Sequence, residues 1–530
     1  MPASRRHGLT PICQAMLLGY ASLAGVAHAA VISGTQTTAQ TMVAGDSVAA
    51  GTTITPPATQ VGITVNANAT GDGSNMVSIG TASGGRTTIT TDSANPLVAW
   101  NGSQSIGATI TNTDMTVNLN TAQASSDIVW WLSGPVTVTN STFTSNNPGN
   151  VDYSGSGRTN GFYFQSPNPM TATSSTFSAA SGTALYVRQS SNLAISGSKI
   201  TANGNTFGVI QTPVTTIGDD SSGNHTIVTL TGINGGSGAY SCGIGLLVSN
   251  WSSGLPQNVL TSTNAMYSAT NHGCGLYDNG GVYNHGMYGT NAIVSDAGNI
   301  TINGGSISTV GDNGTAIEGT DNSAGVFSYS AVLTLQPSSQ GPTVITTQGA
   351  AAHGVMSNLG TTTTVTSAQI TTQGAGADGV HTTDIDADNP TLTLSPGRPV
   401  ATTVNGGTIQ VNGAGSSGIY LSNSTGAPSG LASMTLSGAL KIQNTNSSSY
   451  GVRLVGDNSV VDGSSLSGAT ITSGGTAARM ESGLGQSLKL GASTLSNTSG
   501  DLLQASASGS ASSAITMLLT GVQATAASGQ

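Results

Sequence analysis

Residues 361–382, TTTTVTSAQITTQGAGADGVHT, contain the pattern from which the fold can be worked out. Val365 is followed five residues later by Ile370, and Ile370 is followed ten residues later by Val380. Around these positions apolar residues alternate with small polar ones, as they do in half-buried strands. The stretch therefore predicts three short strands, joined by one tight corner and one longer corner rich in Gly.

The same spacings recur along the chain, which identifies an internal repeat. Five isoleucines, which we call anchors, each precede an apolar partner by ten residues: Ile307 with Ile317, Ile345 with Val355, Ile370 with Val380, Ile409 with Ile419, and Ile442 with Val452. In four of these pairs Gly stands directly before the partner, at Gly354, Gly379, Gly418 and Gly451. The ten-residue step would span a longer, Gly-rich corner, where residues with a positive φ are easily placed.

A repeat of this kind predicts a solenoid in which each coil stacks on the next. Each strand would pair with its counterpart about 4.8 Å along the axis, and the anchors would form a column inside. Successive anchors are unevenly spaced, which indicates loops of variable length at one corner. We therefore predict an all-β chain of about 15 three-strand coils. It is less regular over residues 30–135 and repeats more clearly over residues 136–530.

The composition fits an exported β protein and argues against other classes. The 530 residues include 74 Gly, while charged residues make up 6% and aromatic residues 4%. An ordinary soluble domain carries about 25% charged residues. The net charge of −10 and the scattered Lys and Arg also argue against nucleic acid as a partner.

The N-terminus is typical of a secretory signal peptide over residues 1–29. Arg5 and Arg6 give it a positive start, and an apolar stretch follows. A cleavage site of small residues ends at Ala29, which would leave Ala30 as the first residue of the exported chain. We expect export to the periplasm, and the Sec and twin-arginine routes both stay open.

The segment 240–288 interrupts the repeat and contains the two cysteines that follow the signal peptide, Cys242 and Cys274. Two cysteines in an exported chain most simply form one disulfide. The segment also concentrates aromatic side chains, namely Trp251, Tyr267, Tyr277, Tyr283 and Tyr288. These aromatic residues either pack a local loop over the coils or form a patch that binds a host protein or glycan.

The repeated phrase I-x-x-x-G-x-x-x-x-G-V, seen at residues 345–355 and 370–380, resembles the passenger repeats of pertactin-like (type V) autotransporters. The resemblance covers about residues 135–530, and more weakly 30–135. It implies a right-handed parallel β-helix displayed at the cell surface or outer membrane of a Gram-negative bacterium. The resemblance does not specify an activity, and the residues themselves predict neither a catalytic site nor a cofactor. Passengers of this family are often adhesins or other virulence-associated proteins.

The family pattern continues beyond what this sequence contains. Autotransporters end in a translocating β-barrel, which is absent from this chain, and the sequence stops in the middle of a coil. The sequence is therefore expected to be a fragment or a truncated gene product, and a truncated passenger would be inert.

A polysaccharide-active enzyme is the alternative function, because pectin-degrading hydrolases also use a β-helix. Their Asn-Thr-Asp, Asp-Asp and His-Gly motifs resemble residues 112–114, 219–220 and 272–273 of this chain. Asp114 and Asp219 would lie about four coils, or about 20 Å, apart. The carboxylates of an inverting glycosidase lie about 6.5–9.5 Å apart. A non-enzymatic passenger is therefore the expected function.

Asp384, Asp386 and Asp388 resemble the start of a calcium-binding loop. The sixth position is Asn389 rather than Gly, and the twelfth is Ser395 rather than Glu, which excludes an EF-hand. The expected role is a solvated acidic loop, with a weak surface calcium site as the alternative.

Overall fold

The computed structural model describes residues 29–526 of the chain with several gaps. The gaps are residues 69–74, 93, 101, 103–104, 119–126, 147–160, 181, 204–205, 232–243, 251–256, 271–290, 321–330, 359, 385–398, 425–430 and 507–514. Every named element in the described part is a β-strand. Within that part, no helix has the length and apolar character needed to cross a lipid bilayer.

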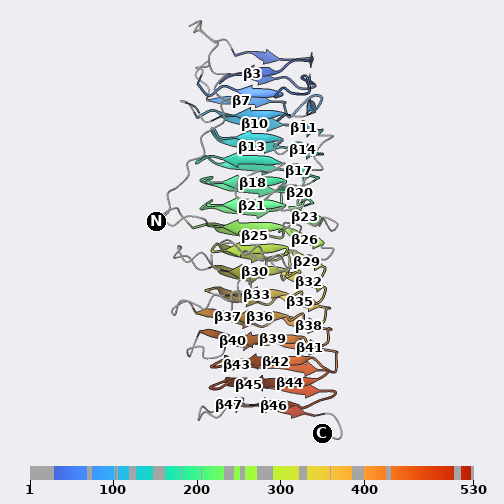
Figure 1. Cartoon of the computed structure of the whole chain (residues 1–530), viewed down its shortest axis with the longest axis vertical. Coiled ribbons are helices and arrows are strands. Elements are labelled where there is room, and N and C mark those ends of the chain that lie inside the picture. The colour runs from blue at the N-terminus through green and yellow to red at the C-terminus, as the bar shows by residue number, and fades with distance from the viewer. Residues whose placement is uncertain are drawn as a thin grey trace, which may run out of the picture.

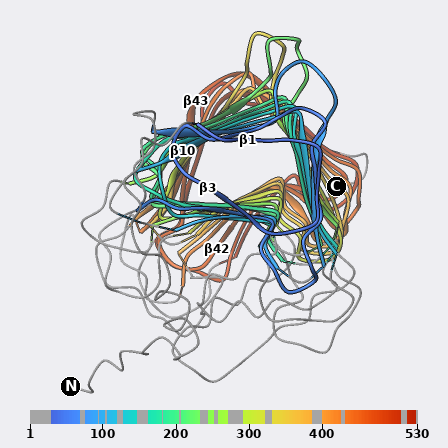
Figure 2. The same ribbon diagram turned by 90° about the horizontal axis from the view of Figure 1, so that it is seen from above.

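The strands form a parallel β-helix, as the repeat predicts. They stack in coils along the long axis of the molecule, from β3 near one end to β46 near the other (Figure 1). Each strand pairs in parallel with the equivalent strand of the next coil, so the chain winds round three faces that enclose the core (Figure 2). This winding is consistent with the right-handed connections that parallel strands almost always use.

One face is a sheet of 16 strands, which we call sheet B. Its strands are β3 (Gln40–Met42), β6 (Ile63–Val65), β9 (Leu97–Ala99), β12 (Val129–Trp131), β15 (Phe162–Gln165), β18 (Leu185–Arg188), β21 (Phe207–Ile210), β24 (Leu246–Ser249), β27 (Ile293–Asp296), β30 (Ile317–Thr320), β33 (Val355–Ser357), β36 (Val380–Thr383), β39 (Ser417–Ser422), β42 (Tyr450–Val455), β44 (Thr476–Glu481) and β46 (Leu503–Ser506).

The other two faces belong to one sheet of 32 strands, sheet A, because β43 (Val460–Ser473) and β45 (Ser487–Asn497) run round the corner between them. The first face also holds β1 (Val31–Ile32), β4 (Ser47–Val48), β7 (Met76–Ile79), β10 (Gly107–Thr111), β13 (Val136–Thr139), β16 (Met170–Thr173), β19 (Leu193–Ser196), β22 (Thr215–Gly218), β25 (Val259–Thr263), β28 (Asn299–Asn303), β31 (Val332–Gln336), β34 (Thr362–Thr366), β37 (Val400–Asn405), β40 (Ala432–Gly438) and β47 (Thr516–Leu519). The second face also holds β2 (Thr35–Gln36), β5 (Thr53–Ile54), β8 (Thr87–Thr91), β11 (Thr113–Val117), β14 (Thr142–Ser145), β17 (Thr176–Ala179), β20 (Lys199–Ala202), β23 (Ile227–Thr231), β26 (Met266–Thr270), β29 (Ser306–Val310), β32 (Val344–Gln348), β35 (Gln369–Thr372), β38 (Thr408–Val411), β41 (Lys441–Asn444) and β48 (Gln523–Thr525).

The predicted columns of apolar residues are confirmed. Ile370 lies in register between Ile345 and Ile409, and Ile409 lies in register with Ile442. The partners, Ile317, Val355, Val380, Ile419 and Val452, stack in the same way in sheet B. All of these side chains belong to one continuous buried core. The five-residue step crosses the tight corner within sheet A, and the ten-residue step crosses the longer corner into sheet B.

The Gly-rich longer corner has residues of positive φ, such as Gly376, but the glycines directly before the partners have another role. None of the four, Gly354, Gly379, Gly418 or Gly451, has a positive φ. Instead, the anchor of the following coil presses against the position where a Cβ would stand. A Cβ on Gly379 would lie 2.3 Å from Cγ2 of Ile409, and one on Gly418 would lie 2.3 Å from Cγ2 of Ile442. These glycines therefore make room for the neighbouring anchor.

Buried hydroxyl groups line the tight corner over several consecutive coils. The backbone N–H of Ser141 donates to Oγ of Ser175 at 3.2 Å, and the N–H of Ser175 donates to Oγ of Ser198 at 3.1 Å. Each hydroxyl in turn donates to the carbonyl two residues earlier, as Ser175 does to Thr173 at 2.8 Å. This ladder satisfies backbone groups that the corner removes from the sheet, and it explains why small hydroxyl residues recur there.

Candidate functional site

The outer face of sheet B carries one side chain from each coil in a single register. Residues on either side of this position point into the core, so the residue between them points outward. We call this series the outer column. From β9 to β44 it consists of Val98, Trp130, Tyr163, Tyr186, Gly208, Leu247, Val294, Glu318, Met356, His381, Tyr420, Arg453 and Arg479.

The N-terminal part of the outer column is aromatic and apolar. The rings of Tyr163 and Tyr186 are stacked with centroids 5.4 Å apart, and Trp130 meets Tyr163 edge to face at 5.9 Å. Tyr163, Tyr186, Leu247 and Val294 belong to a second hydrophobic cluster, separate from the core, and each is at most 8% exposed. This part of the column therefore has the properties of an interior surface.

Glu318 marks the change from apolar to polar character. It is 6% exposed, and its carboxylate accepts hydrogen bonds from the side-chain amides of Asn291 at 2.5 Å and Asn358 at 2.6 Å. These two asparagines come from the coils on either side. The carboxylate thus links three coils at the point where the column becomes polar.

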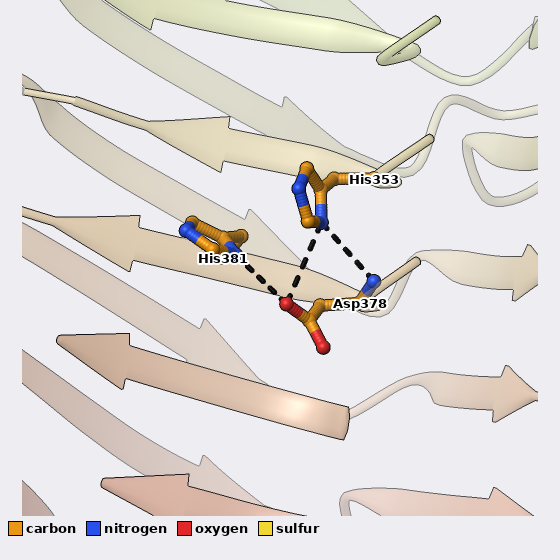
Figure 3. Close-up of side chains that lie close together, drawn as sticks. All are labelled: His353, Asp378 and His381. Atoms are coloured by element: carbon orange, nitrogen blue, oxygen red, sulfur yellow. Dashed lines mark hydrogen bonds and ion pairs between the residues drawn. The ribbon is translucent and has the colours of Figure 1, made fainter. Parts of the chain in front are cut away.

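Two histidines and an aspartate lie together where two neighbouring coils enter sheet B (Figure 3). We call His353, Asp378 and His381 the His–Asp cluster. Nδ1 of His381 lies 2.8 Å from Oδ2 of Asp378, and Nδ1 of His353 lies 3.5 Å from the same oxygen. Nδ1 of His353 also accepts the backbone N–H of Asp378 at 3.1 Å. The other carboxylate oxygen, Oδ1, accepts the backbone N–H of Ser417 at 2.6 Å.

The cluster is shielded from solvent and keeps one histidine neutral. The exposed fractions of the side chains are 12% for His353, 16% for His381 and 6% for Asp378. Burial, reinforced by the neighbouring His381, lowers the pKa of His353 from 6.5 to about 3, although Asp378 acts in the opposite direction. His353 therefore has an unprotonated ring nitrogen that faces Asp378 at neutral pH.

The outer column continues from the cluster into alternating aromatic and cationic side chains. The ring of Tyr420 stacks on His381 with centroids 4.4 Å apart, and the guanidinium of Arg453 lies 5.5 Å from the Tyr420 ring. Tyr450 lies between two arginines, with Arg453 at 4.8 Å and Arg479 at 5.2 Å from its ring. We call Tyr420, Tyr450, Arg453, Arg479 and Glu481 the Arg–Tyr ladder.

Glu481 holds the two arginines of the ladder in place. Its Oε1 accepts from Arg453 at 2.5 Å, and its Oε2 pairs with Arg479. Burial lowers the pKa of Arg453, but the hydrogen bond and charge of Glu481 outweigh burial and raise the pKa above its usual value. Because Arg453 and Arg479 are 27% and 28% exposed, the ladder presents fixed, charged and planar groups to solvent.

This arrangement is better suited to binding than to covalent catalysis. A His–Asp pair can serve as a general base, but a nucleophile must lie within hydrogen-bond reach of the imidazole. In the described part of the chain, the imidazole hydrogen bonds of His353 and His381 run only to Asp378. By contrast, aromatic rings and arginines that are held by their neighbours provide contact area at a low cost in side-chain entropy.

The predicted aromatic patch receives one correction from the structure. Tyr267 is 1% exposed and occupies an anchor position, in register between Val228 and Ile307. Its hydroxyl is paired with that of Ser262 at 2.8 Å inside the core. Tyr267 therefore does not belong to a surface patch. The other predicted members, Trp251, Tyr277, Tyr283 and Tyr288, lie outside the described residues, as do Cys242 and Cys274.

The predicted signal cleavage site lies at the start of the described chain. Ala29 and Ala30 are both exposed. The backbone nitrogen of Ala30 donates to Oδ1 of Asp46 at 2.7 Å, and Asp46 is only 5% exposed. Cleavage after Ala29 would therefore place a positive amino terminus next to a buried carboxylate.

The acidic loop that resembles a calcium site is described only at its first residue. Asp384 is 1% exposed, and Oδ2 accepts hydrogen bonds from the backbone N–H of Ser424 at 2.9 Å and from its hydroxyl at 2.7 Å. Asp384 thus joins two coils and is not a solvated side chain. Asp386 and Asp388 lie outside the described residues.

The carboxylates that resemble a pectinase motif have separate structural contacts. Asp114 lies in β11 and forms a bidentate ion pair with Arg86, whose hydrogen bond lowers the pKa of Asp114. Asp219 follows β22, four coils later, which corresponds to about 19 Å along the axis. Its oxygens are bonded to His225 at 2.8 Å and Gln340 at 3.0 Å. This separation is too large for an inverting pair of carboxylates.

The polar part of the outer column has a recognisable position in the sequence repeat, although the spacing of apolar residues does not reveal it. Each of its members directly follows an apolar partner, so the repeats read Val-Met, Val-His, Ile-Tyr and Val-Arg at this point. Aligning the repeats and reading this one position down the alignment gives Met356, His381, Tyr420 and Arg453. No spacing along the chain connects these residues, because they are neighbours only through strand pairing.

Comparisons with known proteins add no family to this description. No protein-family model matches the chain, and no curated protein matches it. The parallel β-helix is compatible with an autotransporter passenger, and the function has to be argued from the outer face of sheet B.

Proposed function

We propose that this chain is a non-enzymatic, surface-displayed passenger of the autotransporter type that binds a host protein or glycan. The proposal places the binding surface on the outer face of sheet B, at the Arg–Tyr ladder. In this view the β-helix is a rigid support, and the side chains of successive coils form the contact surface.

The observation that carries the proposal is the register of the ladder. Tyr420, Arg453 and Arg479 occupy one column in consecutive strands, about 4.8 Å apart. Tyr450 and Glu481 fix the two guanidinium groups by ring contact and by ion pairs. Binding to such a surface costs little ordering of side chains, because the partners already hold one another.

Other observations support a binding role over an enzymatic one. Asp114 and Asp219 lie too far apart for inverting hydrolysis, and neither imidazole of the His–Asp cluster contacts a nucleophile among the described residues. Export is supported by the signal-like N-terminus and by the low charge content. Tyr and Arg are also the residues that most often dominate binding at protein interfaces.

The test compares the binding of purified variants to host cells and to arrays of host glycans and matrix proteins. Tyr450→Ala and Arg453→Gln should each reduce binding at least tenfold, because each removes a contact group from the centre of the ladder. Arg86→Gln is the matched control. It also breaks an ion pair of a half-exposed arginine, but on sheet A.

The outcome depends on whether both ladder variants differ from the control. Circular dichroism and thermal melts establish that the three variants are folded. Equal binding by wild type, Arg453→Gln and Arg86→Gln would reject the ladder as the binding surface. Hydrolysis of a polysaccharide by the wild-type protein would reject the non-enzymatic assignment.

A further inference from the structure

The His–Asp cluster contains three ligand atoms of the kind that bind transition metals. One ligand atom from each of His353, Asp378 and His381 lies within 4.8 Å of the other two. The two imidazoles approach the same carboxylate oxygen from two neighbouring coils (Figure 3). Imidazole nitrogen with one carboxylate oxygen is a donor set that suits Zn²⁺ and other first-row ions, whereas Ca²⁺ and Mg²⁺ prefer oxygen alone.

The spacing of the donor atoms is close to that of a metal centre. Three ligands about 2.1 Å from a tetrahedral Zn²⁺ ion lie roughly 3.4 Å from one another. The two distances to Oδ2 of Asp378 are 2.8 Å from His381 and 3.5 Å from His353. Small rotations of the rings would bring the donor atoms round one ion.

The surroundings of the cluster already orient the ligands. The backbone N–H of Ser417 holds Oδ1 of Asp378 at 2.6 Å, which leaves Oδ2 directed at the two rings. The ring of Tyr420 stacks on His381 and limits its rotation. Outer groups of this kind fix ligand orientation in natural metal sites, and losing them weakens metal binding about 10–100-fold.

We propose that His353, Asp378 and His381 form a Zn²⁺-binding site with a fourth position open to water or to a partner's ligand. Binding requires Nδ1 of His353 to give up the N–H of Asp378, and it requires His381 to carry its proton on Nε2. These costs make binding weaker than it would be at a site whose ligand atoms were free. The site does not depend on the proposed binding role of the Arg–Tyr ladder.

The chain contains a matched pair that separates this proposal from an ordinary hydrogen bond. His225 contacts Asp219 at 2.8 Å, the same distance as between His381 and Asp378, but within the described residues it has no second imidazole beside it. If a His–Asp contact alone bound the ion, both pairs would contribute to metal binding. If three ligands are needed, only the cluster will bind.

The experiment uses tag-free exported protein that has been dialysed against EDTA. Titration with Zn²⁺ is followed by calorimetry, and titration with Co²⁺ is followed by visible absorption, which reports coordination by nitrogen and oxygen ligands. We expect one ion per chain. His381→Gln, His353→Gln and Asp378→Asn should each weaken binding at least tenfold, while His225→Gln should leave it unchanged.

Two results would overturn the proposal. One is the absence of detectable Zn²⁺ binding by the wild-type protein when Zn²⁺ is present at about 100-fold molar excess over the protein. The other is binding that survives both His381→Gln and His353→Gln, whether or not it is lost in His225→Gln. If Asp378→Asn fails to fold, as judged by circular dichroism, the two histidine variants still decide the outcome, because their hydrogen bonds within the cluster are fewer.

Discussion

Replacing Gly379 by Ala tests how the coils are packed. A Cβ at this position would lie 2.3 Å from Cγ2 of Ile409 and 2.7 Å from the carbonyl oxygen of Gly418. The first atom belongs to a side chain, whereas the second belongs to the backbone of the next coil. Relief therefore requires the two coils to shift apart, and a methyl group inserted into a packed core typically costs about 1–3 kcal/mol.

Another coil of the same protein narrows the expected cost of Gly379→Ala. Ala316 occupies the position equivalent to Gly354 and Gly379, directly before a partner in sheet B, and it is fully buried. A methyl group is thus accommodated where the local spacing of coils permits it. We therefore expect Gly379→Ala to cost about 1–2 kcal/mol, near the lower end of the range.

A double-mutant cycle with Ile409→Ala tests whether contact with Ile409 causes the loss of stability in Gly379→Ala. Ile409→Ala alone should cost about 2–5 kcal/mol, because it leaves a cavity in the core. In that background the contact with Cγ2 of Ile409 is gone and only the contact with the carbonyl oxygen of Gly418 remains, so Gly379→Ala should cost about 0.5–1 kcal/mol less than in the wild type. The measurement is urea-induced unfolding followed by circular dichroism and by intrinsic fluorescence, with the midpoint and slope compared among the four proteins.

Gly376→Ala is the control for this cycle. Gly376 has a φ of +67° and no atom within 4 Å of a Cβ, so its replacement by Ala is costly for conformational reasons alone. Ile409→Ala should not change that cost. Equal costs of Gly379→Ala in the two backgrounds would refute the steric explanation.

Three further predictions concern other parts of the chain. Ser175→Ala removes a buried acceptor and should cost about 1–3 kcal/mol of unfolding free energy, whereas Ser178→Ala on the outer side of β17, the strand that follows Ser175, should change it by less than about 0.5 kcal/mol. In metal-free protein the lowered pKa of His353 means that the unfolded state binds a proton more readily between pH 6.5 and about 3. Stability should therefore fall as the pH decreases through this window, by on the order of 1 kcal/mol per pH unit at most, and urea midpoints should fall less steeply in His353→Gln. Cys242 and Cys274 should form a disulfide, so alkylation of the exported protein without reduction should add no mass, and two added groups would contradict the prediction.

The core was predictable because it depends on residue spacing that the repeat preserves. Wherever an anchor and its partner are both aliphatic, as with Ile370 and Val380, the two intervals locate the strands and the corners. The pattern fails at Tyr267, because the residue five positions before it is Ser262 rather than an apolar residue. A hydroxyl is required there because the buried phenol of Tyr267 needs a polar partner.

The candidate site was not predictable from spacing alone. His353 and His381 belong to different coils, and the loops between anchors vary in length, so their separation along the chain carries no information about contact. The role of Gly379 was not predictable either, because a Gly that makes room for a neighbour and a Gly that adopts a positive φ are identical in sequence. Both cases depend on contacts between coils, which only the register of the strands determines.

The stacking of equivalent residues also bears on how such a protein can change in length during evolution. Ile345, Ile370 and Ile409 make the same kind of contact with the coil before and the coil after. Excision of residues 370–408 would bring Ile345 next to Ile409 and recreate an interface that the protein already contains. Duplication of a coil would do the reverse and extend the molecule by about 4.8 Å. Recombination within the gene can therefore change the length of the β-helix one coil at a time, because each new junction reuses packing contacts that the core already contains.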